Sequence, residues 1–421
     1  MIARIDKSEI KGRVSAPPSK SYTIRGLMCA ALARGESEII HPLSSDDTEA
    51  AINVLRQVGV RILEKGDLWR VGGGDFHAPD AELFCGESAA TLRFMTAICA
   101  VIPGECRLVA GPSLARRPIK PLVEALQRLG VDCSSQGDAP PLTVRGGKFR
   151  GGVAELPGDI SSQFVSALLF LAPLAEEGVK IRLTTLLESK PYVLMTLECL
   201  KKFGIDIKCS QALDEFEVDR QAYKPARYEV EGDWSSASYF LALGAVGGEV
   251  EIESLNLVSL QGDKMMLNFL RDMGAEVEIG HNSVVVRKSK LKAIHADLSQ
   301  CIDLLPTMSV LAAAADGTSE LVGIERARLK ESNRVAAMRE GLERMGVRVR
   351  EEKDKLIITG SEPKGAVIDS KDDHRIAMAF SILGLLAGST VVNGAECVNK
   401  TFPQFWDILK SIGGKIETSG R

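Results

Sequence analysis

Residues 370–388 read SKDDHRIAMAFSILGLLAG, a buried helix with a strongly charged start. From Ile376 to Leu386 almost every residue is apolar, which is typical of a helix that is buried on most of its faces. Aspartates suit the start of such a helix, because they cap unpaired N–H groups and match the positive end of the helix dipole. Arg375 does not suit this position, since a cation is repelled there. We therefore expect an anion beside Arg375.

The composition is that of an ordinary globular protein. The chain has 421 residues, of which 45% are hydrophobic and 26% charged, enough for two or more domains. A net charge of −4 argues against a broad basic surface for nucleic acid. No apolar run reaches the roughly 20 residues that span a bilayer, and the first residues carry no signal pattern. Nine cysteines without a C-x-x-C motif and five histidines without metal-site spacing indicate reduced thiols and no metal. We expect a cytoplasmic protein.

One signature repeats six times along the chain. It is an amphipathic helix that ends in Leu-x-x-apolar-Gly, as in LERMGVRV, and is followed by a strand. Its glycines lie 67 to 74 residues apart: Gly59, Gly130, Gly204, Gly274, Gly346 and Gly413. Each is predicted to end a helix in the left-handed conformation.

A second signature, a polar cluster followed by an apolar helix and a glycine, has the same period. Its glycines lie 69 to 74 residues apart: Gly35, Gly104, Gly178, Gly248, Gly317 and Gly388. Two markers with one period predict six units of about 70 residues, each with one buried helix, one amphipathic helix and several strands. Segments of alternating apolarity predict strands within 248–254, 282–288, 354–360 and 389–394. A repeat scaffold without any chemistry remains an alternative.

The starts of the six apolar helices carry polar residues. They read PPSKSYTIR (17–25), CGESAATLR (85–93), GDISSQF (158–164), GDWSSASYF (232–240), CIDLLPTM (301–308) and KDDHRIAM (371–378). Ordinary capping explains the serines and acids, but not Lys20, Arg25 and Arg375. Helix N-termini bind phosphate and carboxylate groups, so bound anions would explain these cations. If the three buried helices of each half run parallel, their N-termini gather on one face of that half.

Further cations fit an anionic ligand. Arg116 and Arg117 lie in ARRPIKPL, and Lys400 lies in NKTFPQF. Lys330 and Arg334 are predicted to share one helical face at i,i+4, a like-charge pair that an isolated helix resists. For each of these alone, a solvated surface charge is the alternative. No phosphate-binding glycine-rich motif is present, so binding would depend on helix dipoles, lysine and arginine.

Nine stretches resemble the 5-enolpyruvylshikimate-3-phosphate synthase family across essentially the whole chain. They are PPSKSYTIR, GESAATLRF, RRPI, PGDISSQF, SKPYVLMT (189–196), EGDWSSASYF, RLKESNR, DDHRIAMAF and NKTFPQF. The resemblance implies an α/β protein with the enolpyruvyl transferase fold, an inside-out α/β barrel. This fold has two similar domains, each of three βαβαββ-type repeats with buried parallel helices. It also implies domains of 15–227 and of 1–14 with 228–421, with the active site in the cleft between them.

The resemblance also implies an activity. The family transfers the enolpyruvyl group of phosphoenolpyruvate to the 5-hydroxyl of shikimate 3-phosphate and releases phosphate. This is a step of the shikimate pathway to chorismate and the aromatic amino acids. The reaction adds a proton to the methylene of phosphoenolpyruvate as the hydroxyl attacks, and removes it again as phosphate leaves. No cofactor is implied, and a monomer is the family default.

The family motifs assign roles to residues of this sequence. Asp303 would be the base, and Glu331 would protonate the methylene with the help of Lys20. The contacts to shikimate 3-phosphate would come from Lys20, Ser21, Arg25, Ser161, Ser162, Gln163, Ser189, Asp303 and Lys330. The contacts to phosphoenolpyruvate would come from Lys20, Ala89, Arg117, Gln163, Arg334, Arg375 and Lys400. Tyr192 would pack near the first substrate, and His374 would orient the cluster around Arg375.

The sequence departs from the common family pattern in three places. Glu87 stands where an asparagine is frequent, Ala89 where a glycine is frequent, and Arg326 where an asparagine is frequent. The methyl of Ala89 is expected to reduce binding of glyphosate, which inhibits the family at the phosphoenolpyruvate site. The Glu87 carboxylate is expected to add repulsion to this inhibitor.

The sister enzyme that transfers enolpyruvyl to UDP-N-acetylglucosamine is the nearer alternative. It lacks the combined Ser-Ser-Gln, Ser-Lys-Pro-Tyr and Lys-Glu-Ser sets. It also uses a loop cysteine that LARRPI does not contain. A non-catalytic scaffold would not require cations at helix starts.

Overall fold

The computed structural model describes residues 1–420 and divides the chain into two compact units. The first unit is Pro18–Glu231, and the second unit joins Met1–Pro17 to the chain from Gly232 onward. The chain therefore starts in the second unit, passes through the whole first unit and returns.

The first unit contains helices and strands in a repeating order. Its elements are α1 (Lys20–Leu32), β3 (Gly35–Ile40), α2 (Asp46–Gln57), β4 (Arg61–Lys65), β5 (Leu68–Gly73), β6 (Leu83–Phe84), α3 (Ala89–Ile98), β7 (Gly104–Val109), α4 (Lys120–Arg128), β8 (Asp132–Gln136), β9 (Ala139–Gly146), β10 (Gly152–Leu156), α5 (Ser162–Leu171), β11 (Val179–Leu183), α6 (Lys190–Lys202), β12 (Lys208–Cys209), β13 (Glu215–Val218) and β14 (Arg227–Glu229).

The second unit follows the same pattern. Its elements are β1 (Ile2–Asp6), β2 (Ile10–Ser15), α7 (Trp234–Gly247), β15 (Gly248–Glu253), α8 (Met266–Asp272), β16 (Glu276–Ile279), β17 (Ser283–Arg287), β18 (His295–Asp297), α9 (Leu305–Ala314), β19 (Thr318–Val322), α10 (Arg334–Arg344), β20 (Arg348–Glu352), β21 (Lys355–Thr359), β22 (Val367–Asp369), α11 (His374–Ala387), β23 (Thr390–Asn393), α12 (Phe405–Ser411) and β24 (Lys415–Ser419). The strands predicted from alternating apolarity are confirmed as β15, β17, β21 and β23.

Residues 1–420 form six sheets of four strands with one shared topology. In the sheet β6-β7-β9-β8, the first two strands are parallel because α3 connects them, and β8 and β9 form an antiparallel hairpin. The same βαβαββ unit recurs in every sheet, and the predicted α/β repeat is confirmed.

Three repeats are completed by strands that lie far away in the sequence. β14 pairs in parallel with β3 and supplies the first strand of the first repeat. β2 does the same for β15, and β1 pairs with both β23 and β24 in the last repeat. Strands from both ends of the chain thus close the second unit.

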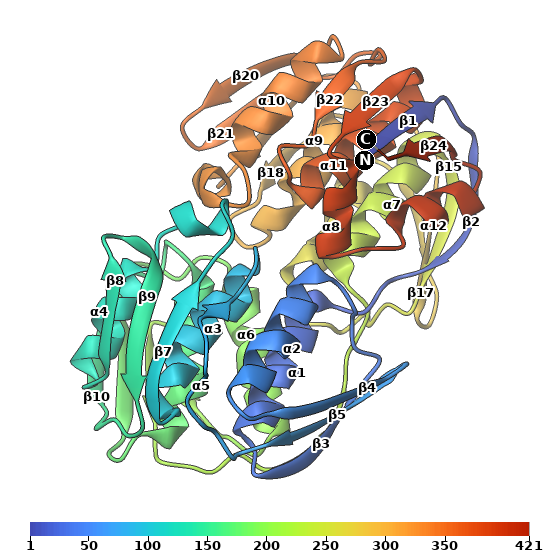
Figure 1. Cartoon of the computed structure of the whole chain (residues 1–421). Helices are drawn as coiled ribbons and strands as arrows, with labels where there is room; N and C mark the ends of the chain where they lie inside the picture. Colours follow the sequence, from blue (N-terminus) through green and yellow to red (C-terminus); the bar gives the residue numbers. More distant parts are fainter. Residues whose placement is uncertain (421) are drawn as a thin grey trace. The chain divides into compact units, whose positions relative to one another are not determined.

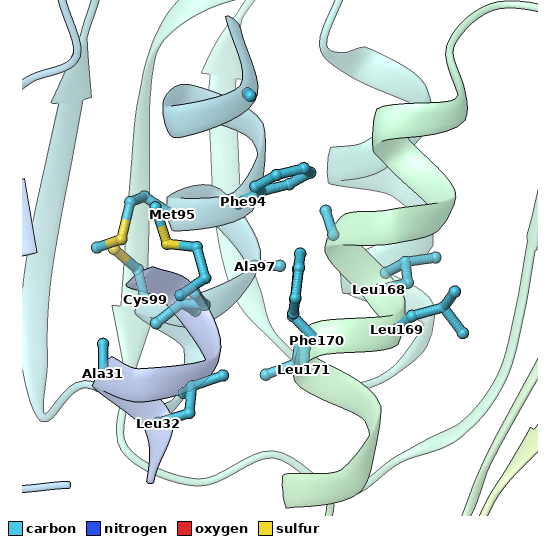
Figure 2. Close-up of a cluster of buried hydrophobic side chains, with 14 of the residues drawn as sticks. Ala31, Leu32, Phe94, Met95, Ala97, Cys99, Leu168, Leu169, Phe170 and Leu171 are labelled. Carbon is cyan, nitrogen blue, oxygen red and sulfur yellow. The ribbon is translucent and has the colours of Figure 1, made fainter. Parts of the chain in front are cut away.

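Three helices in each unit are buried along nearly their whole length: α1, α3 and α5 in the first, and α7, α9 and α11 in the second. In the first unit these helices lie next to one another, with strands outside them (Figure 1). Figure 2 shows the core between them, where Phe94 of α3 meets Phe170 of α5 edge to face at a centroid distance of 5.0 Å. Helices that are apolar on every face need such an enclosed position.

The six glycines of the first sequence signature all have left-handed backbones, with φ between 79° and 104°. They follow the outer helices α2, α4, α6, α8, α10 and α12, as predicted. A left-handed residue ends the helix, and glycine adopts this conformation without steric cost.

None of the helices within residues 1–420 is both long and apolar enough to cross a bilayer.

Candidate active site

The buried helices of the first unit begin with serine caps on the same side of the unit. In each case the serine hydroxyl oxygen accepts a backbone N–H of the first turn: Ser19 accepts from Tyr22, Ser88 from Thr91 and Ser161 from Gln163. Side chains link these starts to one another, as described next. The remaining N–H groups and the dipoles of several helices are therefore directed to one face.

Arg25 connects α1 to two neighbouring helices. Its guanidinium donates to Thr196 Oγ1 at 2.8 Å and to the Tyr192 carbonyl at 3.1 Å, both on α6, and lies over the Phe94 ring of α3. A third bond goes to the Ser21 carbonyl at 3.0 Å. Burial lowers the pKa of Arg25, because removal from water disfavours the charged form. All three acceptors are neutral, so an anionic ligand would stabilise this cation strongly.

Arg93 is a functional candidate that the sequence analysis did not single out. It is buried in α3 and donates to Ser161 Oγ at 2.9 Å and to Gln163 Oε1 at 2.8 Å. It thereby holds two predicted ligands of shikimate 3-phosphate at the start of α5. Arg93 ends the stretch CGESAATLR, so the signal that identified Arg375, an arginine at the start of an apolar helix, was also present here.

Lys20 is the first residue of α1 and pairs with Asp47 of α2, Nζ to Oδ2 at 2.8 Å. The sequence offered no reason to select Asp47, because it lies in an ordinary acidic first helical turn. Ser162 is buried at the start of α5, and Ser189 is buried before α6 in the left-handed region, at φ 53°. These predicted residues therefore all lie at helix starts of the first unit.

The start of α3 and the residues just before it carry two of the three departures from the family pattern. Ala89 is the first residue of α3 and is buried. Glu87 directs its carboxylate to the segment that leads to Arg117, because Oε1 accepts the N–H of Ser113 and Oε2 accepts the N–H of Leu114. Arg117 is itself buried and follows a 3-10 turn, η2 (Leu114–Arg116).

In the second unit, all six predicted site residues form one network. Arg334 donates to Asp303 Oδ1 at 2.8 Å and to Glu331 Oε2 at 2.6 Å. Lys330 and Arg375 approach Asp303 at 3.4 Å and 3.7 Å, and Lys400 approaches Glu331 at 3.8 Å. Residues from four separate segments thus surround two carboxylates.

The prediction that Lys330 and Arg334 share a helical face is wrong. α10 begins only at Arg334, and Lys330 has an extended backbone after the 3-10 helix η6 (Glu325–Leu329). Asn333 caps α10 through its side chain, which ends the irregular segment there. The two cations still meet, because both approach Asp303.

Asp373 is a further member of this network. It caps α11, accepts Arg334 Nε at 2.8 Å and accepts the Ser332 hydroxyl at 2.9 Å. The sequence analysis required a bound anion beside Arg375. The structure places the protein's own Asp303 carboxylate there, 3.7 Å from the guanidinium. Arg375 therefore has a protein counter-ion, and the need for a ligand at this helix start is weaker than expected.

The charges of this network shift two pKa values in a useful direction. Burial alone would raise the pKa of Asp303, but the neighbouring Lys330, Arg375 and Arg334 outweigh it and hold this pKa well below its ordinary range. Burial, reinforced by the charge of Arg334, lowers the pKa of Lys330 to about 8. Asp303 is thus held as an anion that can accept a hydrogen bond, with cations on several sides.

Arg326, the third departure, donates Nη2 to the Ser299 carbonyl at 2.8 Å. His374 is buried at the start of α11, with Nδ1 3.7 Å from Asp373 Oδ1. Tyr192 lies beside Arg25, as described above.

The site residues of the first unit and those of the second unit suit two different chemical tasks. The first unit offers helix N-termini and cations that suit phosphate and carboxylate groups. The second unit offers two carboxylates among four cations, which suits proton transfer next to a second anionic ligand.

Comparison with known proteins agrees with this chemistry. The family model of EPSP synthase (3-phosphoshikimate 1-carboxyvinyltransferase) matches residues 5–409. A 3-phosphoshikimate 1-carboxyvinyltransferase of Dehalococcoides mccartyi is 50% identical over 418 residues, with 99% of both chains covered. That of Methanocaldococcus jannaschii is 42% identical over 418 residues and 97% of each chain. The solved structure of EPSP synthase from Acinetobacter baumannii superposes with a TM-score of 0.84 at 26% identity, covering 100% of both chains. This chain therefore belongs to the EPSP synthase (3-phosphoshikimate 1-carboxyvinyltransferase) family.

Proposed function

We propose that this chain transfers the enolpyruvyl group of phosphoenolpyruvate to the 5-hydroxyl of shikimate 3-phosphate, through the residues described above. The observation that carries the assignment of roles is the network of the second unit. There, Asp303 and Glu331 share Arg334 as a bonding partner. A base and an acid held by one buried guanidinium stay at a constant separation, as two successive proton transfers require.

The first substrate binds to the helix starts of the first unit. Arg25 and Ser189 hold its phosphate, together with the hydroxyls of Ser161 and Ser162. Arg93 keeps Ser161 and Gln163 in place through two hydrogen bonds. Ser21 and Lys330 contact the remaining polar groups of the ring and its carboxylate. Charge-assisted hydrogen bonds of this kind are about twice as strong as neutral ones.

The second substrate binds through cations of both units. Arg117 and Lys20 come from the first unit, with Gln163 and Ala89 beside them. Arg334, Arg375 and Lys400 come from the second unit. These cations offset the phosphate and carboxylate of phosphoenolpyruvate and stabilise the phosphate as it leaves.

The reaction proceeds by addition and elimination. Asp303 accepts the proton of the 5-hydroxyl, whose oxygen forms a bond to C2 of phosphoenolpyruvate while C3 receives a proton from Glu331. The C2–O bond to phosphate then breaks, and C3 gives up a proton to restore the double bond. Lys20 assists the proton transfer at C3. Each step uses general acid–base and electrostatic catalysis.

We further propose that the protein works in the cytoplasm as a monomer. This proposal follows from the reduced-thiol pattern and from the family resemblance.

A steady-state assay tests the function. Phosphate release from phosphoenolpyruvate is measured with shikimate 3-phosphate and, separately, with UDP-N-acetylglucosamine. We expect turnover with the first acceptor only. Turnover only with the UDP-sugar would replace the proposal by the sister activity, and turnover with neither would remove it.

A further inference from the structure

Glu87 lies two residues before Ala89 and binds a neighbouring backbone segment through both of its carboxylate oxygens. Its two carboxylate oxygens accept neighbouring backbone N–H groups, Oε1 from Ser113 at 3.1 Å and Oε2 from Leu114 at 2.8 Å. These N–H groups open the 3-10 turn η2, which ends at Arg116. A carboxylate that accepts two adjacent N–H groups is an effective cap for such a turn.

Gly111 makes room for this carboxylate. A Cβ atom at position 111 would lie 2.4 Å from Glu87 Oε1 and 2.8 Å from Cδ. Such separations are too short for non-bonded atoms, so any larger residue at 111 would displace Glu87. The requirement for glycine here comes from space, because the φ of Gly111 is not in the left-handed region.

The same segment is docked at further points. The Gly111 N–H donates to the Gly86 carbonyl at 2.7 Å, and the Ala115 N–H donates to the Gly111 carbonyl at 2.8 Å. The turn then closes when the Arg117 N–H donates to the Leu114 carbonyl at 3.0 Å. Glu87 and Gly86 thus attach the chain from Gly111 to Arg117 directly to the start of α3.

We propose that Glu87 is a positioning residue for phosphoenolpyruvate. It fixes the backbone of Arg117 relative to Ala89, which follows Glu87 by two residues, so that these two predicted phosphoenolpyruvate contacts belong to one rigid part of the binding site. This inference rests on the proposed role of Arg117. The expectation that the Glu87 carboxylate also repels an anionic inhibitor stays a separate prediction, because accepting two N–H groups does not remove its charge.

The chemistry explains why a carboxylate is used. Here the two N–H groups donate to separate oxygens, and glutamate offers two acceptor oxygens where glutamine offers one, because the other end of its amide is a donor. Glu87→Gln should therefore retain one bond and lose the other. Glu87→Ala should lose both.

The test combines steady-state kinetics with thermal unfolding of the full chain. We expect Glu87→Ala to raise the KM for phosphoenolpyruvate about tenfold or more, and Glu87→Gln to give an intermediate value. The KM for shikimate 3-phosphate should stay within about twofold. Glu82→Gln, an exposed carboxylate of the same unit, is the matched control. Equal changes in both KM values, or no change in either, would overturn the proposal.

A second arm shows whether Glu87 acts through Arg117. In an Arg117→Met background, Glu87→Ala should raise the KM for phosphoenolpyruvate no further. A full additional increase in that background would contradict the positioning role.

A third arm does not depend on the reaction. Gly111→Ala alone should lower the unfolding temperature, whereas in a Glu87→Ala background it should have little further effect. Independent, additive effects would show that the two positions are not coupled. If the wild-type enzyme had no activity on shikimate 3-phosphate, the unfolding measurements would still test whether Glu87 contacts the segment from Gly111 to Arg117. Their result does not depend on the proposed function.

Discussion

Two buried arginines, Arg25 in the first unit and Arg334 in the second, are held in opposite ways. Arg25 donates to a hydroxyl and to two carbonyls, and burial lowers its pKa. Arg334 donates to three carboxylates, those of Asp303, Glu331 and Asp373, and their charges raise its pKa against the effect of burial. The same residue type is thus uncompensated in one unit and compensated in the other.

The different partners of Arg25 and Arg334 indicate different roles, one in substrate binding and one in the chemical step. A buried cation with neutral partners gains most from an incoming anion, so Arg25 is suited to bind a phosphate. A cation that already bridges carboxylates gains less from a ligand and instead holds those carboxylates in place. We infer that the first unit mainly binds the shikimate substrate, whereas the second unit mainly moves protons.

The largest effect should follow from removing the base of the second unit. Asp303→Asn is expected to lower kcat by a factor on the order of 10²–10⁴, typical of the loss of a positioned general base. Glu331→Gln should have a similar effect. Steady-state kinetics on both variants, beside Asp316→Asn as an exposed control, measures this. Turnover near that of the wild type in Asp303→Asn would remove this residue from the proton transfer.

The second prediction concerns the replacement of Arg334 and of Arg25, each separately, by methionine. Arg334→Met leaves three carboxylates, of which Asp303 and Asp373 are buried, without their shared partner, and should lower the free energy of unfolding by about 3–5 kcal/mol. Arg25→Met should instead raise the KM for shikimate 3-phosphate by about 10- to 100-fold, since a hydrogen bond to a charged group contributes about 1.5–3 kcal/mol. Chemical denaturation and kinetics are measured on both, with the exposed Arg34→Met as control. If both variants changed the free energy of unfolding and the KM equally, the proposed difference between Arg25 and Arg334 would be wrong.

The third prediction asks whether the first unit also selects ligands by shape. Ala89 begins α3, and a methyl that crowds a tightly packed site costs about 1–3 kcal/mol. Glyphosate is slightly longer than phosphoenolpyruvate, so this methyl should weaken the inhibitor more than the substrate. Ala89→Gly is expected to lower the ratio of glyphosate Ki to phosphoenolpyruvate KM by about 10- to 100-fold. An unchanged ratio would show that the methyl does not discriminate.

The smallest expected effect is a pH dependence of stability in the second unit. The pKa of Lys330 falls from 10.5 to about 8 on folding. Between these values the unfolded chain holds a proton that the folded chain lacks, so this group makes stability rise with pH, by at most about 1.4 kcal/mol per unit. Below about pH 8 both states are protonated and the contribution to the slope vanishes.

Lys330→Met lacks this contribution. Its free energy of unfolding should therefore rise less, or fall more, than that of the wild type between pH 8 and 10.5. Urea denaturation at several pH values measures the difference, and Lys353→Met, an exposed lysine of the same unit, should follow the wild type. Parallel curves for Lys330→Met and wild type would contradict the lowered pKa.

The repeat architecture could be predicted from sequence because every unit repeats the same two helix endings. The glycines near positions 59 and 130 mark them without any tertiary information. The pairing of strands that lie far apart in the sequence could not be predicted in this way. Nothing in IARID predicts that β1 pairs with both β23 and β24, almost 400 residues away, and only the family resemblance indicated that the chain start joins the second half.

The site shows the same limit. The predicted cations stood out because arginine and lysine are misplaced at helix starts. Their partners did not, since Asp47 and Thr196 look like ordinary helix residues until the fold brings them to Lys20 and Arg25. Periodicity also misplaced Lys330, because a 3-10 helix and an extended residue break the helical pattern before α10.

The mass of the product formed in D₂O tests the central claim, that the carboxylates of the second unit transfer protons during addition and elimination. Enzyme exchanged into D₂O is mixed with unlabelled shikimate 3-phosphate and phosphoenolpyruvate, and the product is analysed by mass spectrometry. If C3 becomes a methyl group during the reaction, the methylene of the transferred enolpyruvyl group should contain deuterium. Product that carries no deuterium at this carbon would contradict the account.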